Sequence, residues 1–139
     1  MIEFHSLDVL FLVENQKAVS EWLNSSGQTE SCTIGSINVI LCSDEHLLGI
    51  NQQFLKHDYY TDIITFDTSE GTILSGDLYI SMDRVVENAS NLRIALLDEL
   101  HRVMVHGLLH LCGYSDKSET EEKAMRFKED HYLSLRAFV

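Results

Sequence analysis

Residues 96–116 read LLDELHRVMVHGLLHLCGYSD, and this stretch decides what the rest of the chain packs around. Its apolar residues recur at steps of three and four, a spacing that predicts a helix with one face in a core. The apolar residues of this helix are Leu96, Leu97, Leu100, Val103, Met104, Leu108 and Leu111. Gly113 is expected to end it, because glycine readily adopts the left-handed conformation that often follows a helix. The stretch therefore predicts a core helix closed by a turn.

Two histidines of this helix have the spacing of metal ligands. His106 and His110 are four residues apart, so they lie on adjacent turns about 40° apart around the helix axis. Asp116 follows Gly113 by three residues, which gives the pattern H-x-x-x-H-x-x-G-x-x-D. Its spacing is that of the metzincin zinc motif, with Asp as the last ligand. A pair of metal-free histidines is the simpler alternative, but the glycine and the third ligand at the expected spacing favour a metal.

We therefore predict that His106, His110 and Asp116 hold one Zn²⁺ ion. Three protein ligands leave a fourth position open for water, which is the arrangement of catalytic zinc sites. The same ligand set also suits iron, nickel or manganese. In zinc peptidases the residue after the first histidine is a glutamate that acts as general base, whereas here it is Gly107. A peptidase would need its base from elsewhere, so the sequence disfavours proteolysis.

The rest of the chain alternates between strands and helices. We predict strands at 2–4, 34–42, 61–67 and 77–81, and helices at 16–25 and 43–55, the second of which Ser43 caps. Gly27 is expected to stop the first helix, while Gly71 and Gly76 mark the turn between the last two strands, which pair antiparallel. Residues 82–111 are helix-permissive, with a break near 88–91.

The C-terminal segment predicts a final helix. Ser118 and Glu121 have the spacing of a capping box at its start. Its charged middle is interpreted as a solvated face around three apolar residues, which are Ala124, Met125 and Phe127.

Composition limits the function further. A chain of 139 residues predicts one domain, 1–139. Its 22 acidic residues against 10 Lys and Arg give a net charge of −12, which excludes a general polycationic binder of nucleic acids or membranes. The three cysteines show no CxxC spacing, so we expect a reduced, cytoplasmic compartment. No signal peptide or membrane span is expected, because no apolar run is long enough.

The motif at 106–116, HGLLHLCGYSD, resembles the signature of the YbeY family, bacterial metal-dependent endoribonucleases of rRNA maturation. Further matches lie at 51–55 (NQQFL), 61–66 (TDIITF) and 76–81 (GDLYIS). The resemblance implies a single α+β domain with a small mixed four-stranded sheet and a zinc at one helix end, held by His106 and His110. It also implies cleavage of single-stranded RNA in 16S rRNA 3′-end processing and ribosome quality control.

The chain departs from the family pattern at two functional positions. The third ligand, usually His, is Asp116, and an Arg before the TD strand, held important for activity, is replaced by Leu55. Lys56 is adjacent and is the candidate to supply a positive charge in its place. Lys56, Arg84 and Lys117 are candidates to contact phosphates, although each also fits an ordinary solvated side chain.

The favoured hypothesis is a zinc-dependent endoribonuclease in which a metal-bound water attacks the phosphodiester, with no side chain assigned as catalyst. Because the surface is acidic, we expect rRNA to be presented by a ribosomal subunit or ribosome-associated proteins. A metallohydrolase of another substrate, including a peptidase, is one alternative. A non-catalytic ribosome-associated module, in which metal only staples the helix end, is the other. The oligomeric state is left open.

Other chemically active residues receive structural interpretations. Glu99 is predicted to face solvent, with support of a metal ligand as the alternative. Asp62 and Asp77 are predicted as turn residues, with the missing base as the alternative. Cys112 is predicted to be a small buried apolar residue. No metal role is assigned to the remaining histidines, which are His5, His46, His57, His101 and His131.

Overall fold

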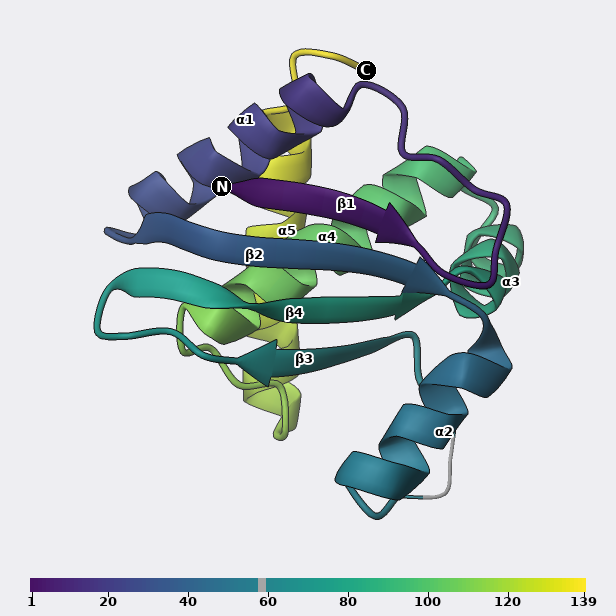
Figure 1. The fold of residues 1–139 in the computed structure, drawn as a ribbon. Helices are drawn as coiled ribbons and strands as arrows, with labels where there is room; N and C mark the ends of the chain where they lie inside the picture. The colour runs from purple at the N-terminus through teal and green to yellow at the C-terminus, as the bar shows by residue number, and fades with distance from the viewer. Residues whose placement is uncertain (58–59) are drawn as a thin grey trace.

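The computed structural model describes residues 1–57 and 60–139, which build a four-stranded mixed sheet. The strands are β1 (Ile2–Ser6), β2 (Thr33–Cys42), β3 (Ile63–Asp67) and β4 (Ile73–Ser81). They lie in the order β1-β2-β4-β3 (Figure 1). β1, β2 and β4 run parallel, whereas β3 is antiparallel to β4 at the edge of the sheet. The predicted antiparallel pair and the mixed sheet are therefore confirmed.

The helices of the described residues cover the sheet unequally. They are α1 (Gln16–Thr29), α2 (Asp44–Phe54), α3 (Met82–Leu92), α4 (Leu96–Leu111) and α5 (Glu119–Ser134). α1 and α4 pack on one face of the sheet, and α3 and α5 pack against α4 (Figure 1). α2 packs on β3 and β4 through a separate small apolar cluster. α4 is thus surrounded by the sheet and by three other helices.

The main core lies between α4 and the sheet. Met104, Leu108 and Leu109 of α4 meet Val39 and Leu78 of the sheet, and all five are at most 2% exposed. The predicted core helix is confirmed, but α4 is buried on more than the predicted face, because Val105 and Leu109 are also fully buried. None of the helices in the described ranges is both long enough and apolar enough to cross a membrane.

The predicted roles of two glycines were wrong, Gly27 as a helix stop and Gly76 as part of a turn. Gly27 does not stop α1, which continues to Thr29. It lies against Ile34, where an added Cβ would be 3.1 Å from Cδ1. Gly76 lies inside β4 opposite Asp67, and a Cβ there would come within 2.2 Å of the Phe66 carbonyl oxygen. Both glycines therefore serve close packing, whereas Gly71 does occupy the turn before β4.

Three element details also differ from the prediction. The helix break falls after Leu92, where Arg93 adopts a left-handed φ of 57° as the C-cap of α3. β3 begins at Ile63, so the two preceding residues lie outside the strand. In α5 only Met125 of the three apolar residues is buried, at 3% exposed, whereas Phe127 is 76% exposed. The predicted capping box of Ser118 and Glu121 is present at the start of α5.

Candidate metal centre

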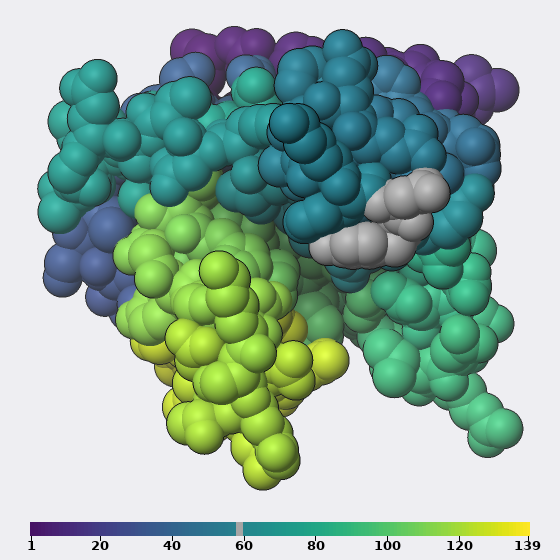
Figure 2. All heavy atoms as spheres, turned by 90° about the horizontal axis from the view of Figure 1, so that it is seen from below, coloured from purple at the N-terminus to yellow at the C-terminus, as the bar shows by residue number. Residues whose placement is uncertain are grey.

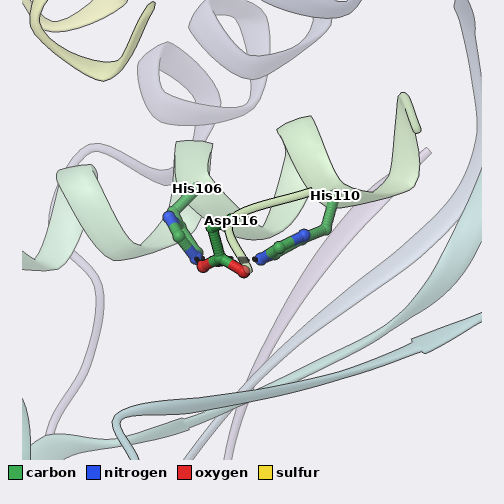
Figure 3. A group of neighbouring side chains, drawn as sticks. All are labelled: His106, His110 and Asp116. Carbon is green, nitrogen blue, oxygen red and sulfur yellow. Dashed lines mark hydrogen bonds and ion pairs between the residues drawn. The ribbon is translucent and has the colours of Figure 1, made fainter. Parts of the chain in front are cut away.

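The three predicted metal ligands come together at the C-terminal end of α4. His106 and His110 project from its last two turns, and Asp116 comes from the segment that follows the helix (Figure 3). Gly113 permits this course with a φ of 104°, and its backbone N–H donates to the His110 carbonyl at 3.0 Å. The N–H of Tyr114 donates to the Leu109 carbonyl at 3.1 Å. This closed turn brings the Asp116 carboxylate beneath the helix.

The ligand atoms have the spacing of a metal site. The Nε2 atoms of His106 and His110 are 2.9 Å apart, and Asp116 Oδ2 lies 3.2 Å and 3.5 Å from them. A tetrahedral zinc ion with bonds of about 2.0–2.1 Å holds its ligand atoms about 3.3 Å apart. The three side chains are 22%, 26% and 37% exposed, so the centre is open to solvent on one side. The donor set therefore fits one divalent ion with an open position.

Each imidazole is oriented by a partner on its other nitrogen. His106 Nδ1 lies 2.7 Å from Glu129 Oε2, and His110 Nδ1 lies 2.9 Å from the carbonyl oxygen of Tyr114. Both Nε2 atoms consequently face the centre. Burial alone would lower the pKa of His106, but the hydrogen bond and charge of Glu129, together with the charges of Asp116 and Asp62, outweigh it, so this pKa is raised.

Glu129 is the residue of this site that the sequence analysis missed. It lies on α5, is 4% exposed, and also accepts a 3.0 Å hydrogen bond from Arg102 Nη1. Arg102 Nη2 donates to the next residue, Asp130, at 2.7 Å. The available signal was the spacing of Glu129 four residues after Met125, which places both on the same helix face.

The prediction that Glu99 faces solvent was wrong. Its side chain is buried, at 4% exposure for the residue, and burial raises the pKa of its carboxyl group. Glu99 Oε1 lies 3.9 Å from Arg102 Nε, so its neighbour is this arginine. Glu99 and Glu129 are therefore two buried acidic residues on either side of Arg102.

The turn before Asp116 is also anchored by residues that are far away in the sequence. The Tyr114 hydroxyl donates to Glu30 Oε1 at 2.6 Å, although Glu30 directly follows α1. Lys128 of α5 donates to the other oxygen of Glu30 at 3.1 Å and lies 4.8 Å from the centre of the Tyr114 ring. Three separate parts of the chain therefore meet at this turn.

A cavity of about 580 Å³ opens beside His106 and Asp116. Its other charged lining residues are Asp62, Glu99, Arg102, Glu122, Lys123, Arg126 and Glu129. Asp62 lies in the bend before β3, as predicted, but its side chain faces this cavity and burial raises the pKa of its carboxyl group. In the view from below, a hollow separates the yellow-green atoms after α4 from the teal atoms of α2 (Figure 2).

The three predicted phosphate contacts lie away from the lining of this cavity. Arg84 on α3 is paired with Asp44 at 3.1 Å and stacks over the Tyr60 ring at 4.8 Å. Lys56 is exposed just after α2, and Lys117 is exposed next to Asp116. The basic residues that line the cavity are Arg102, Lys123 and Arg126, which the sequence analysis did not single out.

Gly107 packs directly on the sheet. A Cβ at this position would lie 2.8 Å from Ile63 Cδ1 and 3.0 Å from Leu78 Cδ1. A side chain here would be directed between helix and sheet, where Leu78 is 1% exposed. The fold therefore gives no room at this position for the glutamate of zinc peptidases.

Comparison with known proteins gives consistent results. A family model described as Endoribonuclease YbeY matches residues 3–136. An endoribonuclease YbeY from Cytophaga hutchinsonii is 50% identical over 139 residues, covering 99% of this chain and 96% of that protein. One from Flavobacterium psychrophilum is 46% identical over 135 residues, covering 97% and 96%. The solution structure of a Thermotoga maritima protein is 29% identical, with a TM-score of 0.66, covering 96% of this chain and 87% of that one.

Proposed function

Because this chain belongs to the YbeY family of endoribonucleases, we propose that it is a zinc-dependent endoribonuclease that cleaves single-stranded RNA in rRNA maturation. The step we assign to it is 16S rRNA 3′-end processing, with ribosome quality control. The observation that carries the proposal is the convergence of His106, His110 and Asp116 on one solvent-open point.

Zinc at this centre would lower the pKa of water toward about 7 and polarise a phosphoryl oxygen of the substrate. The chain's own residues set the conditions for this chemistry. His106 and His110 present neutral nitrogens, and the Asp116 carboxylate adds one negative charge and offsets part of the metal charge. Glu129 and the Tyr114 carbonyl hold the two rings in the orientation that a ligand needs.

The cavity beside the ligands is the proposed path of the RNA backbone. Lys123 and Arg126 of α5 line it and are exposed, so their side chains can contact a phosphate in the cavity. Lys117 stays a proposed phosphate contact because it directly follows Asp116. Lys56 and Arg84 also stay proposals, and they would contact the RNA outside this cavity.

The proposed partners are RNA and, through it, a ribosomal subunit or ribosome-associated proteins. A net charge of −12 supports this, because free RNA is repelled by an acidic surface at long range. Presentation by a partner brings the substrate within reach of the local positive charge of the metal site. The proposed compartment is the cytoplasm, where ribosomes are made.

Cleavage assays on matched substrates test the proposal. Zinc-loaded protein is incubated with a single-stranded RNA, with the same RNA annealed to its complement, and with casein. We expect cleavage of the single strand alone, lost in both His110→Ala and Asp116→Ala. Casein cleavage would indicate a peptidase, and inactivity on all three substrates would indicate a non-catalytic module. Metal analysis of protein purified without added metal checks that zinc is the resident ion.

A further inference from the structure

His106 and His110 differ in the group that contacts Nδ1, the ring nitrogen that does not face the candidate metal position. The partner of His110 is a backbone carbonyl in the turn that follows its own helix, four residues away. The partner of His106 is a carboxylate on another helix, Glu129, 23 residues further along the chain. We propose that Glu129 is a positioning residue that prepares His106 for metal binding, and that Arg102 holds Glu129 in place. This inference rests on the metal site of the proposed function.

The hydrogen bond between these side chains determines which nitrogen of His106 can bind a metal. A carboxylate only accepts hydrogen bonds, so Nδ1 of a neutral His106 must carry the proton and donate it to Glu129. Nε2 then keeps its lone pair and faces His110 and Asp116. The 2.7 Å separation is typical of a hydrogen bond with a charged partner, which is stronger than a neutral one. Glu129 thereby selects both the ring orientation and the tautomer that a metal ion needs.

Arg102 supplies what a buried carboxylate requires. Glu129 is 4% exposed, and a charge with so little access to water needs a partner of opposite sign. Arg102 donates Nη1 to Glu129 Oε1 at 3.0 Å and Nη2 to Asp130 at 2.7 Å, so its planar guanidinium bridges two consecutive residues of α5. With Oε1 occupied, Oε2 is the oxygen left for His106.

Arg102 and Glu129 connect two helices to one proposed ligand, His106. Arg102 lies one turn before His106 on α4, whereas Glu129 belongs to α5. The orientation of His106 consequently depends on how α5 is docked, while that of His110 depends on its own turn. Substitutions of Arg102 or Glu129 should therefore disturb His106 and leave His110 in place.

The test compares Glu129→Gln and Glu129→Ala with Glu122→Gln. Glu122 lies on the same helix and lines the same cavity, but it is exposed, so it controls for the loss of one negative charge. The zinc dissociation constant of each folded protein is measured by competition with a chelator. Loss of such an outer contact typically weakens metal binding by about 10–100-fold, and we expect this for Glu129→Ala. In Glu129→Gln the amide oxygen can still accept the hydrogen bond from Nδ1, so we expect a smaller loss, which measures what the negative charge of Glu129 adds. Glu122→Gln should stay within about threefold of wild type by this reasoning.

A second measurement reads the tautomer without any metal. Long-range ¹H–¹⁵N NMR spectra of the metal-free protein at pH 8 should show His106 protonated on Nδ1 in wild type and a mixture of tautomers in Glu129→Ala. A purely structural role would lower the thermal stability of the Glu129 variants and leave zinc affinity and tautomer unchanged, which would overturn the proposal. A wild-type His106 protonated on Nε2 would also overturn it.

The two proposals fail in different ways. If wild type binds zinc and the Glu129 variants bind it weakly, yet RNA is not cleaved, the proposed function fails and the positioning role stands. If Glu129→Ala does not fold, Glu129→Gln and the wild-type tautomer decide. Arg102→Lys keeps the charge but loses the two-pronged contact, so we expect a zinc affinity between those of wild type and Glu129→Ala.

Discussion

At the scale of single residues, the candidate metal site is built from three possible ligands that lie within eleven residues of sequence. Helical spacing brings His106 next to His110, and one left-handed residue, Gly113, returns the chain to them. The geometry that results has ligand atoms 2.9–3.5 Å apart, which already suits a small divalent ion. The carboxylate is the unusual member of this set, so it provides the sharpest single-residue test.

Asp116→Ala removes the proposed third ligand and the only negative charge in the proposed ligand set. We expect the variant to lose most of its bound metal, because two imidazoles alone leave half of the tetrahedral positions without a protein ligand. Metal content after dialysis, measured by mass spectrometry, checks this. Asp116→His should retain metal, because imidazole is also a good zinc ligand. Stoichiometric metal in Asp116→Ala would remove Asp116 from the ligand set.

His101 gives a pH-dependent prediction that is independent of the metal site. It is 2% exposed, and burial, together with the nearby charge of Arg136, lowers its pKa to about 4 despite the opposite effect of Asp98. Between about pH 6.5 and 4 the unfolded chain binds a proton on this ring that the native protein does not. His101 therefore makes the folded state lose stability as the pH falls through this range.

His101→Gln should remove this loss, because an amide is neutral at every pH and its oxygen can accept the hydrogen bond that Arg136 Nη1 gives to the ring. Urea unfolding at pH 7.5 and pH 4.5 measures the difference. We expect wild type to lose about 2–3 kcal/mol more than the variant on acidification. Equal losses in the two proteins would mean that His101 is protonated in the folded state.

At the scale of elements, local signals predicted the helices and strands well. Three- and four-residue periodicity located α4, and the Ser118 capping box located the start of α5, because both depend on neighbours in sequence. Gly27 and Gly76 were misread because a glycine that ends an element and one that allows close packing look the same locally. Glu129 was missed as a buried residue because its partners, Arg102 and His106, project from α4, and no local pattern shows how α4 and α5 meet. Glu99 was expected to face solvent because acidic side chains are mostly exposed.

The contact of α4 with the sheet gives a prediction for Gly107. Alanine favours a helix over glycine by about 1 kcal/mol, but here its methyl group would lie 2.8 Å from Ile63 Cδ1 and 3.0 Å from Leu78 Cδ1. Overpacking of this kind costs about 1–3 kcal/mol, so Gly107→Ala should destabilise the protein or leave no gain. Urea unfolding measures the effect.

Gly49 provides the matched control, because it lies within α2 and an added Cβ would meet no atom within 4 Å. Gly49→Ala should stabilise the protein by up to about 1 kcal/mol from helix propensity alone. Equal stabilisation by the two substitutions would show that α4 can move away from the sheet without cost.

At the scale of the whole molecule, the net charge of −12 repels RNA, whereas the local positive charge of a bound metal would attract it. A basic RNA-binding protein loses affinity steeply as salt rises, because each neutralised phosphate releases counterions. Here salt also screens the repulsion between an acidic protein and RNA over about 8–10 Å. We expect kcat/KM on a free single-stranded RNA to change little, or to rise, between 50 and 200 mM salt.

Cleavage assays across this salt range, at fixed free zinc and pH, measure the slope. A fall of a hundredfold or more would indicate many phosphate contacts, as in a basic binding surface, and would contradict the idea that a partner presents the substrate. The same assay with Lys123→Ala and Arg126→Ala separates local contacts from the overall field, since these residues line the cavity.

The hydroxyl of Tyr114 donates to Glu30, 84 residues earlier in the chain, and this contact limits how well the site can be transferred to another protein. The eleven residues that contain all three ligands would make an attractive graft for a designed helical protein. Transplanted alone, they would carry the coordinating atoms but neither the carboxylate behind His106 nor the anchor of the turn. A faithful transfer requires a host that supplies an acid in the place of Glu129 and another in the place of Glu30.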